Sequence, residues 1–180
     1  MTKQIALLRG VNVGGNRMVA MADLKAMLEA CGFTEVKTVL QSGNVIFRSE
    51  TLKGPELEAF LDAETLRRLG LASRYIVRDA GKWRAIVAAN PFTGDARDTP
   101  SRVLVTVGRA PFTKDALDAV RAALLPHEKL EADGRTLYAV FGEGMGQSKA
   151  AEVLNRAAAR VVATGRNWNT VLKLAEAAGA

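Results

Sequence analysis

The spacing of apolar residues changes along the first half of the chain, from the unbroken runs of buried strands to the three- and four-residue spacing of helices. Residues 3–9 predict a strand, and its continuous apolar core from Ile5 to Leu8 is typical of a strand buried on both faces. Apolar side chains then recur at helical spacing up to Cys31, and Gly32 follows as the usual left-handed stop. The rest of this half predicts a hairpin over residues 36–47, a helix over 55–69, a strand over 75–77 and a helix over 80–89.

The second half of the chain repeats this order after a turn-rich stretch over residues 91–100. It predicts a strand over residues 102–107, a helix over 113–124, a hairpin over 129–141, a helix from about 148, a short apolar strand over 161–163 and a helix over 168–178. Corresponding residues of the two halves lie about 90 positions apart, as the hairpin glycines Gly43 and Gly134 and the closing-helix tryptophans Trp83 and Trp168 show. This spacing favours an internal duplication. The expected fold is α+β, with two tandem ferredoxin-like (βαββαβ) halves, each followed by an extra helix. We expect an N-terminal domain over residues 1–92 and a C-terminal domain, with its closing helix, over 99–180.

The composition is that of a globular chain. The 180 residues are 48% hydrophobic, enough for one substantial core or two small ones, and no apolar stretch approaches the roughly 20 residues of a membrane span. The N-terminus enters a strand at once and lacks the apolar segment of a signal peptide. The single cysteine, Cys31, lies on the apolar face of its predicted helix, which favours a buried, inert thiol. These features indicate a cytoplasmic protein.

The formal net charge of +6 suits an acidic partner such as a phosphate ligand or a nucleic acid. The excess is shared evenly by the two halves and forms no basic tail or block, so the charge pattern favours nucleic acid only weakly. Aromatic residues make up only 6% of the chain, and the strand over residues 45–47 does not show the aromatic pattern with which an RNA-binding sheet stacks bases.

Polar residues suited to binding an anion gather at four places in the sequence. These are a glycine-bearing loop after the first strand, the first hairpin turn, the helix start near residue 148, and the polar stretch before the last helix. Glycine-rich turns and helix N-termini present backbone N–H groups to anions, and arginine or lysine side chains add positive charge. The candidate ligand-binding residues are Arg9, Asn12, Gly14, Gly15, Arg17, Gln41, Asn44, Ser148, Lys149, Arg166, Asn167 and Asn169.

Each of these places also has a purely structural interpretation. The glycines of the first loop can simply permit positive φ, and the first hairpin turn can be a plain turn. Ser148 is a preferred helix cap, and Asn167 or Thr164 can cap the last helix. The polar side chains around Trp168 outnumber what one cap requires, so a ligand or a hydrogen-bond network is the open alternative there.

The residues that are scarce argue against several chemistries. One histidine, His127, and one cysteine cannot supply a typical zinc site, and no nucleophile–histidine pair for acyl transfer is evident. The stretch from Gly142 to Lys149 departs from the phosphate-binding-loop pattern, because Ser148 precedes the lysine and Ala150 follows it. The loop after the first strand also lacks the dinucleotide-binding spacing of glycines. We therefore expect no metal and no cofactor.

Five short motifs lie at residues 5–15, 41–47, 90–92, 148–149 and 166–171. Together and in this order they resemble an uncharacterised bacterial family, domain of unknown function sixteen ninety-seven, from Lys3 to about Leu174. The resemblance implies two ferredoxin-like halves in a cytoplasmic protein, and it implies no activity, cofactor or catalytic residue. Ala20 and the pair Ala150-Ala151 depart from the residues usual in the family, so a ligand pocket shaped by those positions would be altered.

These observations favour a cytoplasmic protein that binds a phosphate-bearing small molecule or a nucleic acid. Two alternatives stay open. One is an enzyme that uses carboxylate or lysine chemistry in a cleft between the halves, although no pair of such residues is singled out by its spacing. The other is a structural or interaction module, in which the polar motifs serve folding and domain docking.

Overall fold

The fold is described from a computed structural model, which covers residues 2–10 and 19–180. Four of the candidate ligand-binding residues, Asn12, Gly14, Gly15 and Arg17, lie outside the described residues.

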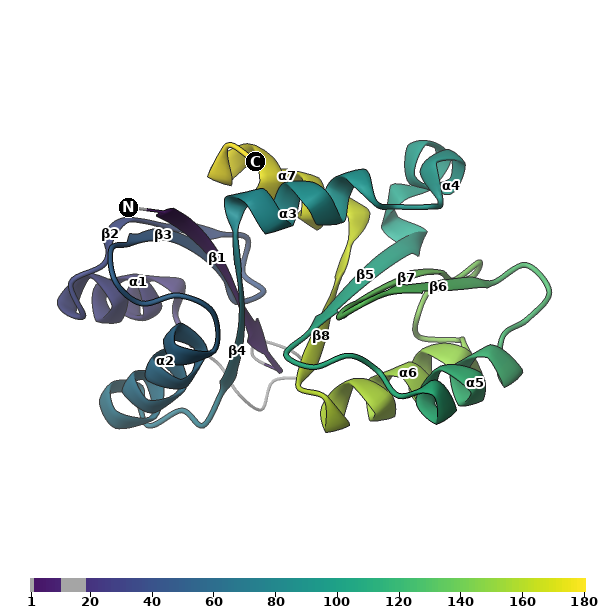
Figure 1. Ribbon diagram of the computed structural model, residues 1–180, viewed down its shortest axis with the longest axis horizontal. Coiled ribbons are helices and arrows are strands. Elements are labelled where there is room, and N and C mark those ends of the chain that lie inside the picture. Colours follow the sequence, from purple (N-terminus) through teal and green to yellow (C-terminus); the bar gives the residue numbers. More distant parts are fainter. Residues whose placement is uncertain (1, 11–18) are drawn as a thin grey trace. The chain divides into compact units, whose positions relative to one another are not determined.

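The first half forms a four-stranded antiparallel sheet, called sheet A, with two helices on one face (Figure 1). Its strands are β1 (Thr2–Arg9), β2 (Thr34–Val39), β3 (Asn44–Ser49) and β4 (Arg74–Asp79), in the order β2-β3-β1-β4. The covering helices are α1 (Met21–Ala30) and α2 (Gly54–Leu69), and α3 (Ala80–Ala88) follows the last strand.

The second half repeats this arrangement as sheet B. Its strands are β5 (Val103–Gly108), β6 (Lys129–Asp133), β7 (Thr136–Val140) and β8 (Ala163–Asn167), in the order β6-β7-β5-β8. The helices α5 (Lys114–Ala122) and α6 (Lys149–Arg160) cover one face, and α7 (Trp168–Ala178) follows the last strand (Figure 1). Two antiparallel sheets with the same strand order confirm the predicted α+β class and agree with a repeat of two halves.

The chain divides into two compact units. Unit 1 comprises residues 1–85 together with 173–180, and unit 2 comprises residues 86–172. The division therefore falls inside α3 and inside α7, the two helices that follow the sheets.

Two segments differ from the sequence-based expectation. The stretch over residues 91–100, expected to be turns, contains α4 (Thr93–Asp98) and begins the 3₁₀-helix η1 (Pro100–Arg102). Helix α4 is too short to show the spacing of apolar residues that marks a helix in a sequence. Its backbone hydrogen bonds run from the Ala96 N–H to the Phe92 carbonyl and from the Thr99 N–H to the Asp95 carbonyl. The last strand begins at Ala163 rather than at residue 161, and it runs through the polar residues 164–167. Val162 has a φ of 50°, which makes it a turn residue between α6 and β8 and keeps the apolar run out of the strand.

The core of unit 1 fills the space between sheet A and its two helices. Its largest fully buried side chains are Leu8, Leu24, Leu28, Phe47, Leu57, Leu61 and Tyr75. In unit 2 the corresponding layer lies between sheet B and α5 and α6, and α6 contributes mainly small side chains. Ala150 and Ala151 are both fully buried there, so their small side chains shape the core beneath α6.

Edge strand β4 is held by carboxylates of the helix that packs on it. The Tyr75 backbone N–H donates to Asp62 Oδ1 and the Val77 backbone N–H donates to Glu58 Oε1, both at 2.9 Å. Glu58 and Asp62 are four residues apart and so lie on one face of α2. This arrangement satisfies edge N–H groups that would otherwise be available to another strand, and it fixes α2 against sheet A.

Replacing Glu58 by alanine should destabilise unit 1, because Glu58 is only 5% exposed and the Val77 N–H would lose its acceptor. An unsatisfied buried donor costs about 1–3 kcal/mol. Since each kcal/mol lowers the melting temperature by roughly 2–4 °C in a protein of this size, we expect a loss of several degrees in a thermal melt. Glu56→Ala, a change at an exposed position two residues before Glu58 on α2, is the matched control and should leave the melting temperature nearly unchanged.

Candidate functional site

The predicted residues of unit 1 that can be placed lie toward one end of sheet A. Arg9 ends β1, and the β2–β3 hairpin lies alongside because Leu7 pairs with Asn44. The Asn44 side chain is fully buried and donates to Val39 O at 3.0 Å and to Ser42 Oγ at 2.8 Å. Asn44 therefore stabilises the hairpin turn, while Gln41 is exposed and Arg9 is half-buried at the same end of the sheet.

Two of the predicted residues, Ser148 and Lys149, lie at the start of α6, and they differ in their surroundings. Ser148 is the N-cap of α6, and its Oγ accepts a hydrogen bond from the Ala151 backbone N–H at 3.2 Å. This confirms capping, the structural alternative for Ser148. Lys149 is the first residue of the helix and is exposed to solvent.

The polar stretch before α7 contains both a cap and a half-buried cation. Asn167 Oδ1 accepts from the Thr170 backbone N–H and from Thr170 Oγ1, both at 3.0 Å, so Asn167 holds the first turn of α7. Arg166 Nη1 donates to Thr164 Oγ1 at 2.8 Å and to Gly165 O at 2.9 Å. Burial lowers the pKa of the Arg166 guanidinium to about 10. Asn169 is exposed on the first turn of α7.

The register of β8 separates Arg166 from the start of α6. Arg166 pairs with Val105, whereas the neighbouring Gly165 lies against Leu104, a member of the core beneath α5 and α6. Since side chains alternate between the faces of a sheet, Arg166 lies on the face opposite α6. Within unit 2 the structure therefore does not bring Arg166 and Lys149 to one face of sheet B.

A cavity in unit 1 involves residues that the sequence motifs did not single out. It lies where β1 begins, β4 ends and α2 and α3 start, and its volume is about 720 Å³. Its lining includes Gln4, Lys53, Asp79 and Lys82. The sequence offers little signal for it, since Gln4 follows Lys3 and stands before the apolar residues 5–8 of the first strand, where a polar side chain is not unusual.

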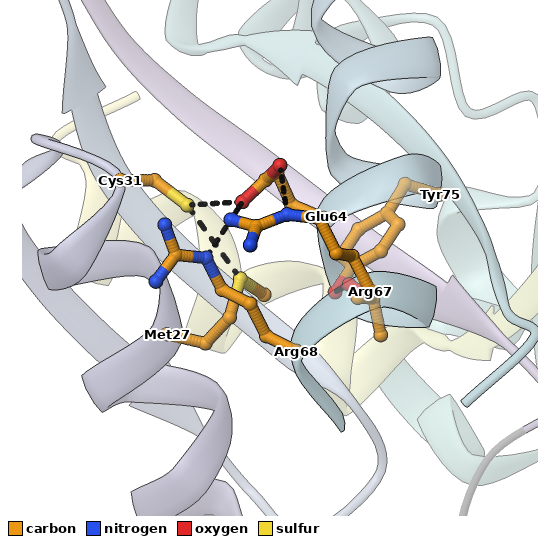
Figure 2. A network of polar contacts seen from close by, with 7 residues as sticks. Met27, Cys31, Glu64, Arg67, Arg68 and Tyr75 are labelled. Carbon is orange, nitrogen blue, oxygen red and sulfur yellow. Dashed lines mark hydrogen bonds and ion pairs between the residues drawn. The ribbon is translucent and has the colours of Figure 1, made fainter. Parts of the chain in front are cut away.

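Cys31 belongs to a polar network that connects the ends of α1 and α2. Its Sγ donates to Glu64 Oε2 at 3.6 Å, and Glu64 also accepts hydrogen bonds from Arg67 and Arg68, as Figure 2 shows. Hydrogen bonds from Arg67 and Arg68 lower the pKa of Glu64 to about 2. Burial, aided by Glu64, raises the pKa of the Cys31 thiol above its usual value, although Arg68 opposes this. A raised pKa favours the protonated thiol, which is the less reactive form. Cys31 is half-buried, whereas the sequence predicted a buried thiol.

The motif over residues 90–92 forms a buried turn. Asn90 is 5% exposed, and its Oδ1 accepts from the Phe92 backbone N–H at 3.0 Å. Asn90 Nδ2 is a buried side-chain donor without a hydrogen-bond partner among the described residues.

Two further findings concern the described part of the chain. No helix there is long and apolar enough to cross a membrane. In the same residues, 2–10 and 19–180, no group of three or more histidine, cysteine, aspartate and glutamate side chains is placed to hold a metal ion.

These features define an α+β protein of two repeated antiparallel units, with polar candidate positions and a cavity. A family described as protein of unknown function (DUF1697) matches residues 1–138, and the chain belongs to that family. A comparison with curated proteins finds no match.

Two solved structures are similar to the chain. The conserved bacterial protein SP0830 from Streptococcus pneumoniae is 22% identical with a TM-score of 0.73, and the similarity covers 98% of both chains. An unknown protein from Galdieria sulphuraria is 13% identical with a TM-score of 0.28, over 92% of this chain and 96% of that one. The first similarity shows that the two-unit fold is shared.

Replacing Glu64 by glutamine should make Cys31 more reactive. The carboxylate of Glu64 raises the pKa of the thiol, so its removal lowers that pKa and increases the thiolate fraction at every pH below it. Each pKa unit corresponds to about a tenfold change in thiolate. Alkylation by iodoacetamide, followed by mass spectrometry between pH 7 and 9, should therefore be several-fold faster in the variant.

Glu50→Gln, an exposed change elsewhere in unit 1, is the control for this measurement. Equal alkylation rates for the two variants under native conditions would contradict the assigned role of Glu64. In denaturant, where the network is lost, the two rates should coincide.

Proposed function

We propose that this protein binds a small phosphate-bearing molecule, with Arg166 as the principal anion-binding side chain. The observation that carries the proposal is the partial burial of this guanidinium, which lowers its pKa to about 10. An oxyanion that reaches a desolvated cation interacts with it through a lower dielectric than at an open surface. The guanidinium remains positively charged at neutral pH, and its planar fork matches the oxygens of a phosphate group.

The other predicted residues contribute to this proposal to different degrees. Asn44, Ser148 and Asn167 have hydrogen bonds that hold their own backbone, so they act in it as supports of the local fold. The side chain proposed to contact the ligand directly is Arg166. Lys149 lies on the other side of sheet B and is not part of this site. An anion-binding role of Arg9, Gln41 and Asn169 stays a prediction, as it does for Asn12, Gly14, Gly15 and Arg17, which lie outside the described residues.

A small molecule suits the charge distribution better than a nucleic acid does. Affinity for a nucleic acid rests on several phosphate contacts along a continuous basic surface. Here the excess of +6 is spread over both halves without a basic block, and only 6% of residues are aromatic. A single phosphate group needs fewer cations, which scattered arginine and lysine side chains can supply.

The proposal extends to the fold and the location of the protein. We propose that each half is a ferredoxin-like domain, over residues 1–92 and 99–180, each with a closing helix. The element order βαββαβ and the strand orders β2-β3-β1-β4 and β6-β7-β5-β8 support this. A cytoplasmic location is supported by the single cysteine, which has no second cysteine in this sequence to form a disulfide with.

Replacing Arg166 by glutamine should remove most of the stabilisation that a phosphate ligand provides. A ligand at 100 times its Kd stabilises the folded protein by about 2.7 kcal/mol, which raises the melting temperature by roughly 5–10 °C. We expect this rise for the wild-type protein in thermal melts with pyrophosphate, AMP or ATP, with a smaller effect at high salt. The Arg166→Gln variant should show little rise.

Arg160→Gln, an exposed change in the last turn of α6, is the matched control and should retain the full ligand effect. The proposal fails if none of these phosphates stabilises the wild-type protein, or if both variants respond equally. Stronger binding of a labelled single-stranded oligonucleotide than of any of the three would favour nucleic acid instead.

A further inference from the structure

A cavity in unit 1 has the size and position of a small-molecule site. Its volume of about 720 Å³ lies within the range of roughly 300–1,000 Å³ that ligand sites occupy. It opens at the end of sheet A where β1 begins and β4 ends, between the starts of α2 and α3. All of its lining residues belong to unit 1.

Gln4 is a buried polar side chain that lines this cavity. It is 3% exposed and lies on the core face of β1, since Gln4, Ala6 and Leu8 alternate with Ile5 and Leu7. Its primary amide offers two donor hydrogens and an acceptor oxygen. That amide makes no hydrogen bond with any residue the structure describes. The described part of the fold provides no partner for this amide, and its nitrogen and oxygen are not among the fully buried polar atoms that lack a partner, so they are open to the cavity.

The start of α2 places further donors at the same cavity. The N-cap residue is Lys53, and no side chain caps the helix. The first N–H groups of a helix have no acceptor within the helix, and the helix dipole adds partial positive charge there. The Lys53 ammonium also lines the cavity, and within residues 2–10 and 19–180 it forms no ion pair. An oxyanion is the ligand group that these donors fit.

The carboxylates of the cavity restrict the rest of the ligand. The Lys82 backbone N–H donates to Asp79 Oδ1 at 2.8 Å, and the Lys82 ammonium lies 3.3 Å from Asp79 Oδ2. Burial acts to raise the pKa of Asp79, but the bonds from Lys82 outweigh it and leave that pKa lowered, so Asp79 is an ionised acceptor. Glu56 adds a second, exposed carboxylate to the lining. Because two cations and two carboxylates balance, the cavity suits a ligand with one anionic end and hydrogen-bond donors elsewhere.

We propose that this cavity binds a phosphorylated polyhydroxy compound of the sugar-phosphate class. The phosphate lies at the N-terminus of α2 beside Lys53. The hydroxyl groups donate to Asp79 and exchange hydrogen bonds with the Gln4 amide, which both donates and accepts. The site shares no residue with the one proposed around Arg166, so each can be tested without the other.

Isothermal titration calorimetry tests the proposal with glucose 6-phosphate, ribose 5-phosphate and glycerol 3-phosphate as probes, and with glucose and inorganic phosphate as comparisons. At least one sugar phosphate should bind more tightly than both comparisons. Lys53→Gln should weaken that binding at least about tenfold, the loss expected for one charge-assisted contact. Lys37→Gln, an exposed change on β2 outside the cavity, should leave it unchanged.

Gln4→Met separates a ligand-binding role of Gln4 from a structural one. Met fills a similar volume without polar atoms, so this variant should lose sugar-phosphate binding while its melting temperature stays the same or rises. Arg166→Gln should bind the sugar phosphate as the wild-type protein does, which distinguishes failure of the two sites. The proposal is overturned if no sugar phosphate binds, if inorganic phosphate binds as tightly, if the Lys53 and Lys37 variants bind equally, or if Gln4→Met lowers the melting temperature and keeps full binding.

Discussion

Unit 1 depends on the hydrogen bonds that join α2 to the open edge of β4. Glu58 and Asp62 accept from the Val77 and Tyr75 N–H groups, so the helix lies along the strand with its position along the sheet determined. A buried hydrogen bond between Thr65 and Tyr75, at 2.7 Å, continues the same contact further along α2. Because the helix is fixed at these points, its N-terminus has a defined place beside the first residues of β1. The cavity at that end of the sheet is a consequence of this docking.

Sequence patterns predicted most elements of the fold because burial imposes a period on the sequence. The run over residues 3–9 and the helical spacing of α1 follow directly from which faces are buried. The pattern was wrong about β8, whose half-exposed residues Thr164 to Asn167 have no apolar period to detect. Val161 and Val162 looked like a strand, although the positive φ of Val162 places them in the turn before it. Helix α4 was missed for a related reason, since six mostly polar residues cannot display a helical face.

The candidate site was harder to predict than the fold, because a polar residue near a turn or helix start serves the backbone before it serves a ligand. Ser148, Asn167 and Asn44 each use their side-chain oxygen or nitrogen locally. The residues that line the cavity of unit 1 do not belong to one local turn or helix start. Gln4, Lys53 and Lys82 come from three separate elements, and only the folded sheet brings them together. No spacing along one segment can reveal such a set.

The composition of unit 1 has a consequence for how the chain acquires its structure. Unit 1 includes residues 173–180, and the Arg84 guanidinium donates to the Gly179 carbonyl at 3.4 Å. Unit 2 is continuous in sequence, so all of it is translated before the last segment of unit 1 has been made. Translation therefore begins unit 1 first but reaches residues 173–180 of that unit only after all of unit 2 has been made. Unit 1 is thus the first of the two units to be started and the last to be finished.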